Sequence, residues 1–137
     1  MDTISYRSAA PVTVEMFIDL LHASGLAARR PVDDRECIEG MLKNSNLVIT
    51  AWAGDELVGI ARALTDFHYA CYLSDLAVAI SHQKLGIGRE LQRQLQSHLG
   101  QRCKIILIAA PAANDYYPTL GYSHVDRCWV ADHSVDL

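Results

Sequence analysis

The sequence has no excess of positive charge and no long apolar run, and each absence excludes a class of protein. The formal net charge of −4 argues against a nucleic-acid partner, because binding to a phosphate backbone requires a basic face. No stretch approaches the roughly 18 apolar residues of a membrane-spanning helix. The first residues also lack the basic start and apolar run of a secretion signal. We therefore expect a cytoplasmic protein with neither nucleic acid nor membrane as a partner.

Paired cysteines are also absent. The four cysteines lie far apart, with no CxxC motif and no histidine at metal-finger spacing: Cys37, Cys71, Cys103 and Cys128. No metal site is therefore expected. Three of them stand among apolar or strand-like residues, which predicts buried free thiols and agrees with a reducing compartment.

What the chain does contain is typical of a globular protein. Half of its 137 residues are apolar and a fifth are charged, so disorder is not expected. This length fits one domain over residues 1–137, because a second domain would lack the sequence to build its own core. No repeat or Pro/Gly/Ser-rich linker divides the chain.

Helical periodicity occurs in three places. Phe17 and Leu21 share one face of a helix that Gly25 can end in a left-handed turn. A second helix follows Asp33, a candidate N-cap, with Cys37 on its apolar face. From residue 86 to residue 100, apolar residues recur every four positions, while polar residues such as Gln92 face outward.

A short helical segment is expected around residues 115–120, and strand patterns fill most of the remainder. A weakly signalled short strand lies around residues 4–6. Residues 104–109 read as a strand buried on both faces. The other predicted strands are a hairpin over residues 47–52 and 57–64, a strand over residues 70–79 and a final strand over residues 122–131. This order predicts an α/β protein with a mixed sheet and helices on both faces.

The segment with chemical information is the junction between the strand that ends at residue 79 and the helix that follows. The loop QKLGIG, residues 83–88, joins them. The first N–H groups of a helix have no partner within it, and the helix dipole favours an anion there. Gly86 and Gly88 would let a phosphate approach the backbone closely. Taken alone, they are weak evidence, because a tight turn and close helix packing explain two glycines better than an anion site does. No P-loop and no dinucleotide motif is present.

The segment resembles the acetyl-CoA-binding motif of the GCN5-related N-acetyltransferase (GNAT) family. Gln83, Gly86 and Gly88 occupy the fixed positions of Q/R-x-x-G-x-G/A, and LAV at residues 76–78 matches the L-x-V that precedes it. Downstream, YYPTLGY resembles Y-x-x-x-G-F/Y, with Tyr117 at the tyrosine position. The likeness covers residues 47–122. One departure is the isoleucine at position 80, where many members have proline.

The resemblance implies the GNAT acyl-CoA N-acyltransferase fold, a mostly antiparallel, splayed sheet with helices on both faces. It also implies a transferase that moves the acetyl group of acetyl-CoA to an amine, on a small molecule or a peptide, by direct attack and without a metal. Two alternatives remain open: a CoA-binding sensor or interaction module on the same fold, and an adaptor that binds no CoA.

The resemblance further assigns binding roles. Backbone groups of Leu76, Ala77 and Val78 would pair with the pantetheine arm as an added strand would. The pyrophosphate would lie on the amides of the following loop. The charges of Lys84 and Arg89 would lie near the 3′-phosphate, or would simply be solvated. The residues expected to hold the diphosphate end are Gln83, Lys84, Leu85, Gly86, Ile87, Gly88 and Arg89.

Three residues are candidates for catalysis. The N–H near Val78 would stabilise the oxyanion, and Tyr117 would protonate the departing thiolate, unless it is a packing tyrosine. Pro118 puts the direction of the Tyr117 hydroxyl in question, since proline disfavours a helix interior. Asp75 shares a strand face with Ala77, so it either acts as a base or makes a structural hydrogen bond to a loop. An exposed final strand would favour a homodimer.

Overall fold

The computed structural model describes residues 3–137, and its sheet has five strands in the order β1-β2-β3-β4-β5. The first four strands are antiparallel neighbours, and β5 is parallel to β4. The sheet is therefore mixed and mostly antiparallel, as predicted. The strands are β1 (Ile4–Arg7), β2 (Leu47–Ala53), β3 (Glu56–Thr65), β4 (Ala70–Val78) and β5 (Lys104–Ile106).

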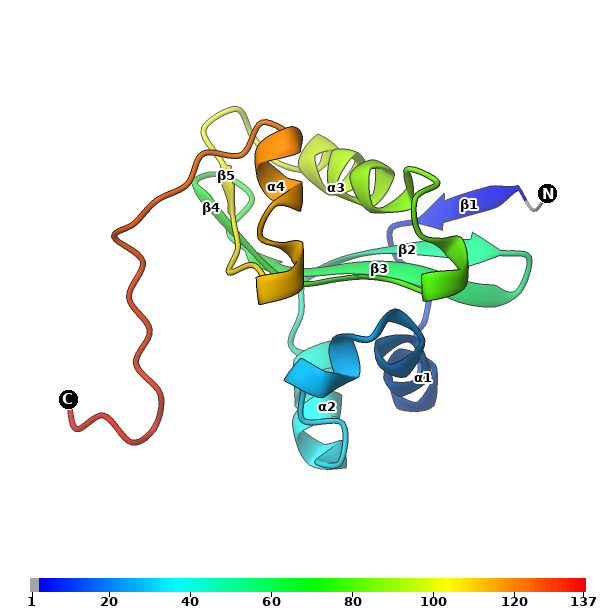
Figure 1. Cartoon of the computed structure of the whole chain (residues 1–137), viewed down its shortest axis with the longest axis horizontal. Coiled ribbons are helices and arrows are strands. Elements are labelled where there is room, and N and C mark those ends of the chain that lie inside the picture. The colour runs from blue at the N-terminus through cyan, green and yellow to red at the C-terminus, as the bar shows by residue number, and fades with distance from the viewer. Residues whose placement is uncertain (1–2) are drawn as a thin grey trace.

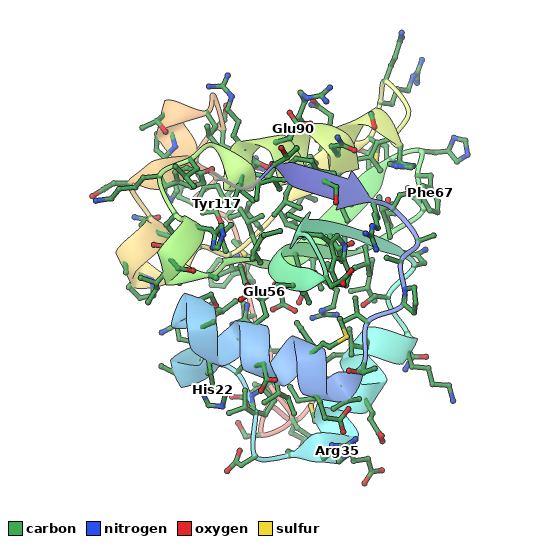
Figure 2. All side chains as sticks on the ribbon, turned by 90° about the vertical axis from the view of Figure 1, so that its right-hand side faces the viewer. His22, Arg35, Glu56, Phe67, Glu90 and Tyr117 are labelled. Carbon is green, nitrogen blue, oxygen red and sulfur yellow. The ribbon has the colours of Figure 1, made fainter. Side chains whose placement is uncertain are left out.

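Helices cover both faces of the sheet, which confirms the predicted architecture (Figure 1). Helices α1 and α2 lie on one face, and α3 and α4 lie on the other. Figure 2 shows His22 of α1 and Glu90 of α3 on opposite sides of the sheet. The helices are α1 (Val14–Ser24), η1 (Leu26–Arg29), α2 (Arg35–Lys43), η2 (Ile80–His82), α3 (Ile87–Ser97), η3 (Pro111–Ala113) and α4 (Tyr116–Thr119).

The core lies between the sheet and one apolar face of each long helix. Phe17 and Leu21 of α1 are fully buried, as are Leu91 and Leu95 of α3. Each such side chain contributes on the order of 2 kcal/mol relative to exposure. Gly59 of β3 lets α3 approach closely, because a Cβ there would lie 3.1 Å from Leu91. The predicted periodic faces are therefore the ones that hold α1 and α3 on the sheet.

Two local predictions on the α1–α2 side need correction. Gly25 ends α1 at φ 84° as expected, but the side chain of Asp34, not Asp33, caps α2 by accepting from the Cys37 amide at 3.1 Å. That places Cys37 on the exposed first turn. Cys128 is exposed as well, so only Cys71 is a fully buried thiol, and all four cysteines are free.

The last two predicted strands differ from the structure. Within residues 104–109 only Lys104–Ile106 forms a strand, and it lies at the edge of the sheet, with Ile106 48% exposed. Residues 122–131 form no strand and extend away from the sheet (Figure 1). A β pattern needs a paired neighbour to become a strand, and within residues 3–137 this segment has none. Trp129 is 90% exposed in consequence.

Strand β4 contains a bulge, which lies close to the place where β4 and β5 separate. Arg62 is opposite Asp75 and Ala63 is opposite Leu73, so Ser74 is an extra residue in the ladder. Such a bulge bends its strand. The pairing of β4 with β5 covers only residues 70–72. Beyond that point the edge of β4 faces a gap, which is the splay that the resemblance implied.

Candidate active site

The N-terminus of α3 presents main-chain donors that have no acceptor. Gly86, at φ 82°, is the N-cap residue and provides no side-chain bond to the helix. The first bond of the helix runs from the Glu90 amide to the Gly86 carbonyl at 3.1 Å. Within residues 3–137, the amides of residues 84–89 donate to no other protein group. Together with the helix dipole, these donors favour an anion.

The two glycines of the motif serve different purposes. A Cβ on Gly86 would meet no atom within 4 Å, so the space beside it is open and its positive φ is the constraint. A Cβ on Gly88 would lie 3.2 Å from the Tyr116 hydroxyl oxygen. Gly86 therefore shapes the loop, whereas Gly88 lets the side chain of Tyr116 approach α3. Close packing therefore explains the glycine at position 88 but not the one at position 86.

Gln83 ties the loop to the end of β4. Its amide donates to the Ile80 carbonyl at 3.3 Å, so this amide is not among the free donors. Its side-chain Nε2 donates to the Val78 carbonyl at 2.9 Å. The side chains of Lys84 and Arg89 are exposed beside the loop, whereas Ile87 is buried in the core.

The edge of β4 alternates between paired and open main-chain groups. The Ala79 amide donates to the Val58 carbonyl of β3 at 2.8 Å. Since antiparallel ladders alternate, the amide of Ala77 also faces β3, and those of Leu76 and Val78 face the gap. Leu76 therefore has its amide and carbonyl available and Val78 has its amide available, because the Val78 carbonyl accepts from Gln83. The backbone groups of Ala77 are not available.

Tyr117 lies half-buried on α4. Its helix begins at Tyr116, so Pro118 stands in the first turn, where a missing N–H costs nothing. The ring makes edge contacts with Tyr116 and Tyr122 at centroid distances of 5.2 Å and 5.3 Å. Burial, with a smaller effect from Tyr116, raises the pKa of Tyr117 above its usual 10.0. The phenol is thus protonated at neutral pH and can donate a proton.

Gln92 connects α4 to α3, a role that the sequence pattern missed. It was expected to face outward, yet it is only 5% exposed. Its Nε2 donates to the Gly88 carbonyl at 3.0 Å and lies 3.4 Å from the Tyr116 hydroxyl. The Tyr122 hydroxyl donates to its Oε1 at 2.7 Å. A buried amide with several partners fixes orientation, and helical spacing alone cannot reveal such partners.

Asp75 lies beneath the gap and is 1% exposed. Its Oδ1 accepts from Arg30 Nε and its Oδ2 from Arg62 Nε, both at 2.5 Å. Arg62 also donates to the Ser74 hydroxyl at 2.8 Å. With both oxygens engaged by guanidinium groups, this geometry favours the structural alternative for Asp75. The sequence indicated that this carboxylate needs a partner, because it lies in an apolar strand. It did not indicate that the partners are Arg30 and Arg62.

A cleft of about 1030 Å³ brings most of these elements together. It runs from η1 across the open part of β4 to η3 and α4. Leu76, Val78 and Tyr117 line it, and so do Arg29 and Arg30. Figure 2 shows Tyr117 between the level of α3 and that of α1. The loop residues 84–89 are outside the cleft lining, at the start of α3.

Two further observations concern metal binding and membrane-spanning helices. Within residues 3–137, no group of three His, Cys, Asp or Glu side chains is placed to hold a metal ion. In the same range, no helix combines the length and the apolar character that crossing a bilayer requires.

Comparison with known proteins decides the family. The sequence model described as acetyltransferase (GNAT) domain matches residues 23–135. The chain belongs to the GNAT acetyltransferase family. An uncharacterized N-acetyltransferase, ycf52 of Pyropia yezoensis, is 33% identical over 87 residues, which are 59% of this chain and 50% of that protein. The chain therefore matches about half the length of this curated relative.

Solved GNAT structures share the fold. A GNAT family acetyltransferase of Streptococcus pneumoniae TIGR4 has a TM-score of 0.75 at 21% identity, over 94% of this chain and 98% of that one. The aminoglycoside N-acetyltransferase AAC(6')-Iy, in complex with CoA, has a TM-score of 0.73 at 17% identity, over 98% and 97%. Membership of the GNAT family indicates acyl-CoA-dependent acetyl transfer.

Proposed function

We propose that this GNAT protein transfers an acetyl group from acetyl-CoA to the amine of a second substrate. One observation carries the proposal. The unpaired amides of residues 84–89 lie at the positive end of α3, next to a strand edge that opens into the cleft containing Tyr117. A diphosphate and an extended amide chain fit such a combination.

The residues present fit the diphosphate and the pantetheine arm of acetyl-CoA. The pyrophosphate would accept from amides of the loop before α3, where the space beside Gly86 is open. Exposed Lys84 and Arg89 would add charge near the phosphates. The pantetheine arm would continue the sheet along β4, paired with the main chain of Leu76, and its thioester end would reach the open amide of Val78. This direction would bring the thioester into the cleft.

The reaction needs one hydrogen-bond donor and one proton. The neutral amine nitrogen bonds to the acetyl carbon, and the carbon–sulfur bond then breaks. The sulfur leaves with a proton from the enzyme, and the nitrogen releases its own proton to solvent, which reprotonates the donor. We assign the oxyanion donor to the Val78 amide, which faces the gap. We assign the proton to the Tyr117 hydroxyl, which burial keeps protonated. Asp75 then acts through Arg30 and Arg62, which it holds in place, and not as the base.

Two measurements test the function. CoA at about 100 times its Kd should stabilise the fold by about 2.7 kcal/mol in a thermal shift experiment. Release of free thiol from acetyl-CoA should then depend on an added amine. Saturable CoA binding without turnover on any amine would support the sensor alternative, and absence of CoA binding would refute the proposal.

We also propose a homodimer. The edge strand β5 has a row of unpaired main-chain groups, which is a template for another strand. Residues 122–131 have a strand pattern without a partner, and Trp129 and Val130 are 90% and 74% exposed. A second copy would cover both by strand addition. Light scattering should give twice the 15.2 kDa chain mass, and Trp129→Ser should reduce this to a monomer.

A further inference from the structure

The charged side chains of the cleft are all of one sign. Three arginines line it: Arg29, Arg30 and Arg62. No aspartate, glutamate or lysine is among the lining residues. Asp75, buried behind Arg30 and Arg62, supplies the only negative charge in contact with them among residues 3–137. Three guanidinium groups and one carboxylate leave two positive charges, although the whole chain carries a net charge of −4.

These charges lie on the acceptor side of the site. Arg29 and Arg30 belong to η1 and its end, on the α1–α2 face of the sheet, whereas the loop for the diphosphate begins α3 on the other face (Figure 1). The proposed diphosphate site thus belongs to α3, on the face of the sheet opposite to the arginines. The arginines remain for a ligand that enters from the α1–α2 side and meets the thioester at the gap in β4.

Arg62 and Arg30 differ in how many donors they keep. A guanidinium has five N–H donors. Arg62 uses four of them, on Asp75, Ser45, Met41 and Ser74, and its side chain is only 4% exposed. Its role is to hold the floor of the cleft.

Arg30 uses only three donors, on Asp75, the Ser74 carbonyl and the Arg29 carbonyl. Its side chain is 22% exposed, so two N–H groups remain for a ligand. Arg29 is exposed, and within residues 3–137 its guanidinium makes no hydrogen bond or ion pair. Arg30 is therefore held rigidly by Asp75 beside a second cation that is free to move. Guanidinium pairs of this kind bind carboxylate and phosphate groups.

We infer that the acceptor is a small amine that also carries an anionic group, a carboxylate or a phosphate, bound by Arg29 and Arg30. This inference rests on the proposed acetyl transfer. A polycation would meet net positive charge in this cleft without a carboxylate to bind it. The chain thus differs in acceptor class from the structurally similar enzyme AAC(6')-Iy, whose name identifies it as an aminoglycoside N-acetyltransferase.

The test compares amines that differ only in the anionic group. One set pairs amino acids with the amines left by removing the carboxylate, and another pairs aminoalkyl phosphates with the corresponding amino alcohols. Kanamycin serves as the polycation. We expect kcat/KM at least about tenfold higher for the anionic member of one set. The set that shows this identifies carboxylate or phosphate. Added salt should raise its KM, because it screens an exposed charge.

Arg29→Gln is the diagnostic variant, since Arg29 supports no other side chain. It should raise KM about tenfold for the anionic amine and leave KM for the neutral amine unchanged. Arg102→Gln removes another exposed arginine, outside the cleft, and should change neither value. An equal or better reaction with neutral amines or kanamycin, or an unchanged KM in Arg29→Gln, would overturn the inference while acetyl transfer stands.

A binding measurement separates the two proposals if turnover is absent. Calorimetry on the protein saturated with CoA should show heat with the anionic amine, and this affinity should fall in Arg29→Gln. Binding of CoA without binding of any anionic amine would refute the acceptor class. A protein that binds no CoA would refute the acetyltransferase itself.

Discussion

The molecule has two positively polarised regions, and they are built in different ways. At the start of α3 the positive potential comes from unpaired main-chain amides of residues 84–89. In the cleft it comes from the side chains of Arg29 and Arg30, and Asp75 orients only the second of these. The first region is formed by one continuous loop. The second depends on segments that are 45 residues apart in the chain. The two should therefore fail independently.

The largest effect is expected for Asp75→Asn. The substitution leaves two guanidinium groups against a neutral amide in a buried place, and removal of one partner of a buried pair typically costs about 3–5 kcal/mol. Urea denaturation should show this loss, whereas Asp55→Asn in the exposed β2–β3 turn should change stability by less than about 0.5 kcal/mol. Folded Asp75→Asn should retain its affinity for CoA. A parallel loss of CoA affinity would show that the two regions are coupled.

Gly86→Glu is the corresponding test of the main-chain region at the start of α3. It forces a side chain into a residue at φ 82° and places a negative charge at the proposed diphosphate position. CoA should bind at least 100-fold more weakly by calorimetry, which corresponds to about 2.7 kcal/mol.

Gly54→Glu is the matched control for that variant, because Gly54 also has a positive φ, of 61°, and lies in the distant hairpin turn. It carries the same kind of backbone cost without touching the site. Unchanged CoA affinity in Gly86→Glu would remove the loop from the binding site. An equal loss in both variants would attribute the effect to the fold.

Tyr117→Phe should affect the chemical step alone. Loss of the proton donor should lower kcat by roughly 100-fold, with CoA affinity unchanged. Since burial raises the pKa of Tyr117 above 10.0, the protonated, active form persists through pH 10, and activity should fall only at higher pH. The variant should lack this alkaline fall. Tyr69→Phe removes an exposed hydroxyl elsewhere and should leave kcat and its pH profile intact.

The difference between a local loop and a site built from distant segments also explains which features could be predicted from the sequence. The loop before α3 is a local motif, so Gln83, Gly86 and Gly88 predicted its place at the start of the helix, and the periodic faces of α1 and α3 predicted the layers. Arg30 and Gln92 gave no comparable signal, because their partners come from distant segments. The prediction of a strand over residues 122–131 was wrong for a related reason. A strand pattern specifies a side-chain alternation, but its pairing partner has to come from elsewhere in the chain.

The smallest effect concerns Glu90, in the first turn of α3. Hydrogen bonds from Arg93 and then Gln94 lower the pKa of Glu90 to about 2. A lowered pKa in the folded state stabilises the protein above the unfolded value of 4.5, and this contribution is lost as the pH falls toward about 2. Since the pair is largely solvated, Glu90→Gln should cost no more than about 0.5 kcal/mol at neutral pH. The difference from wild type should vanish between pH 4.5 and 2 in urea titrations. A difference that persists at pH 2 would mean that Glu90 stabilises α3 through packing and not through its charge.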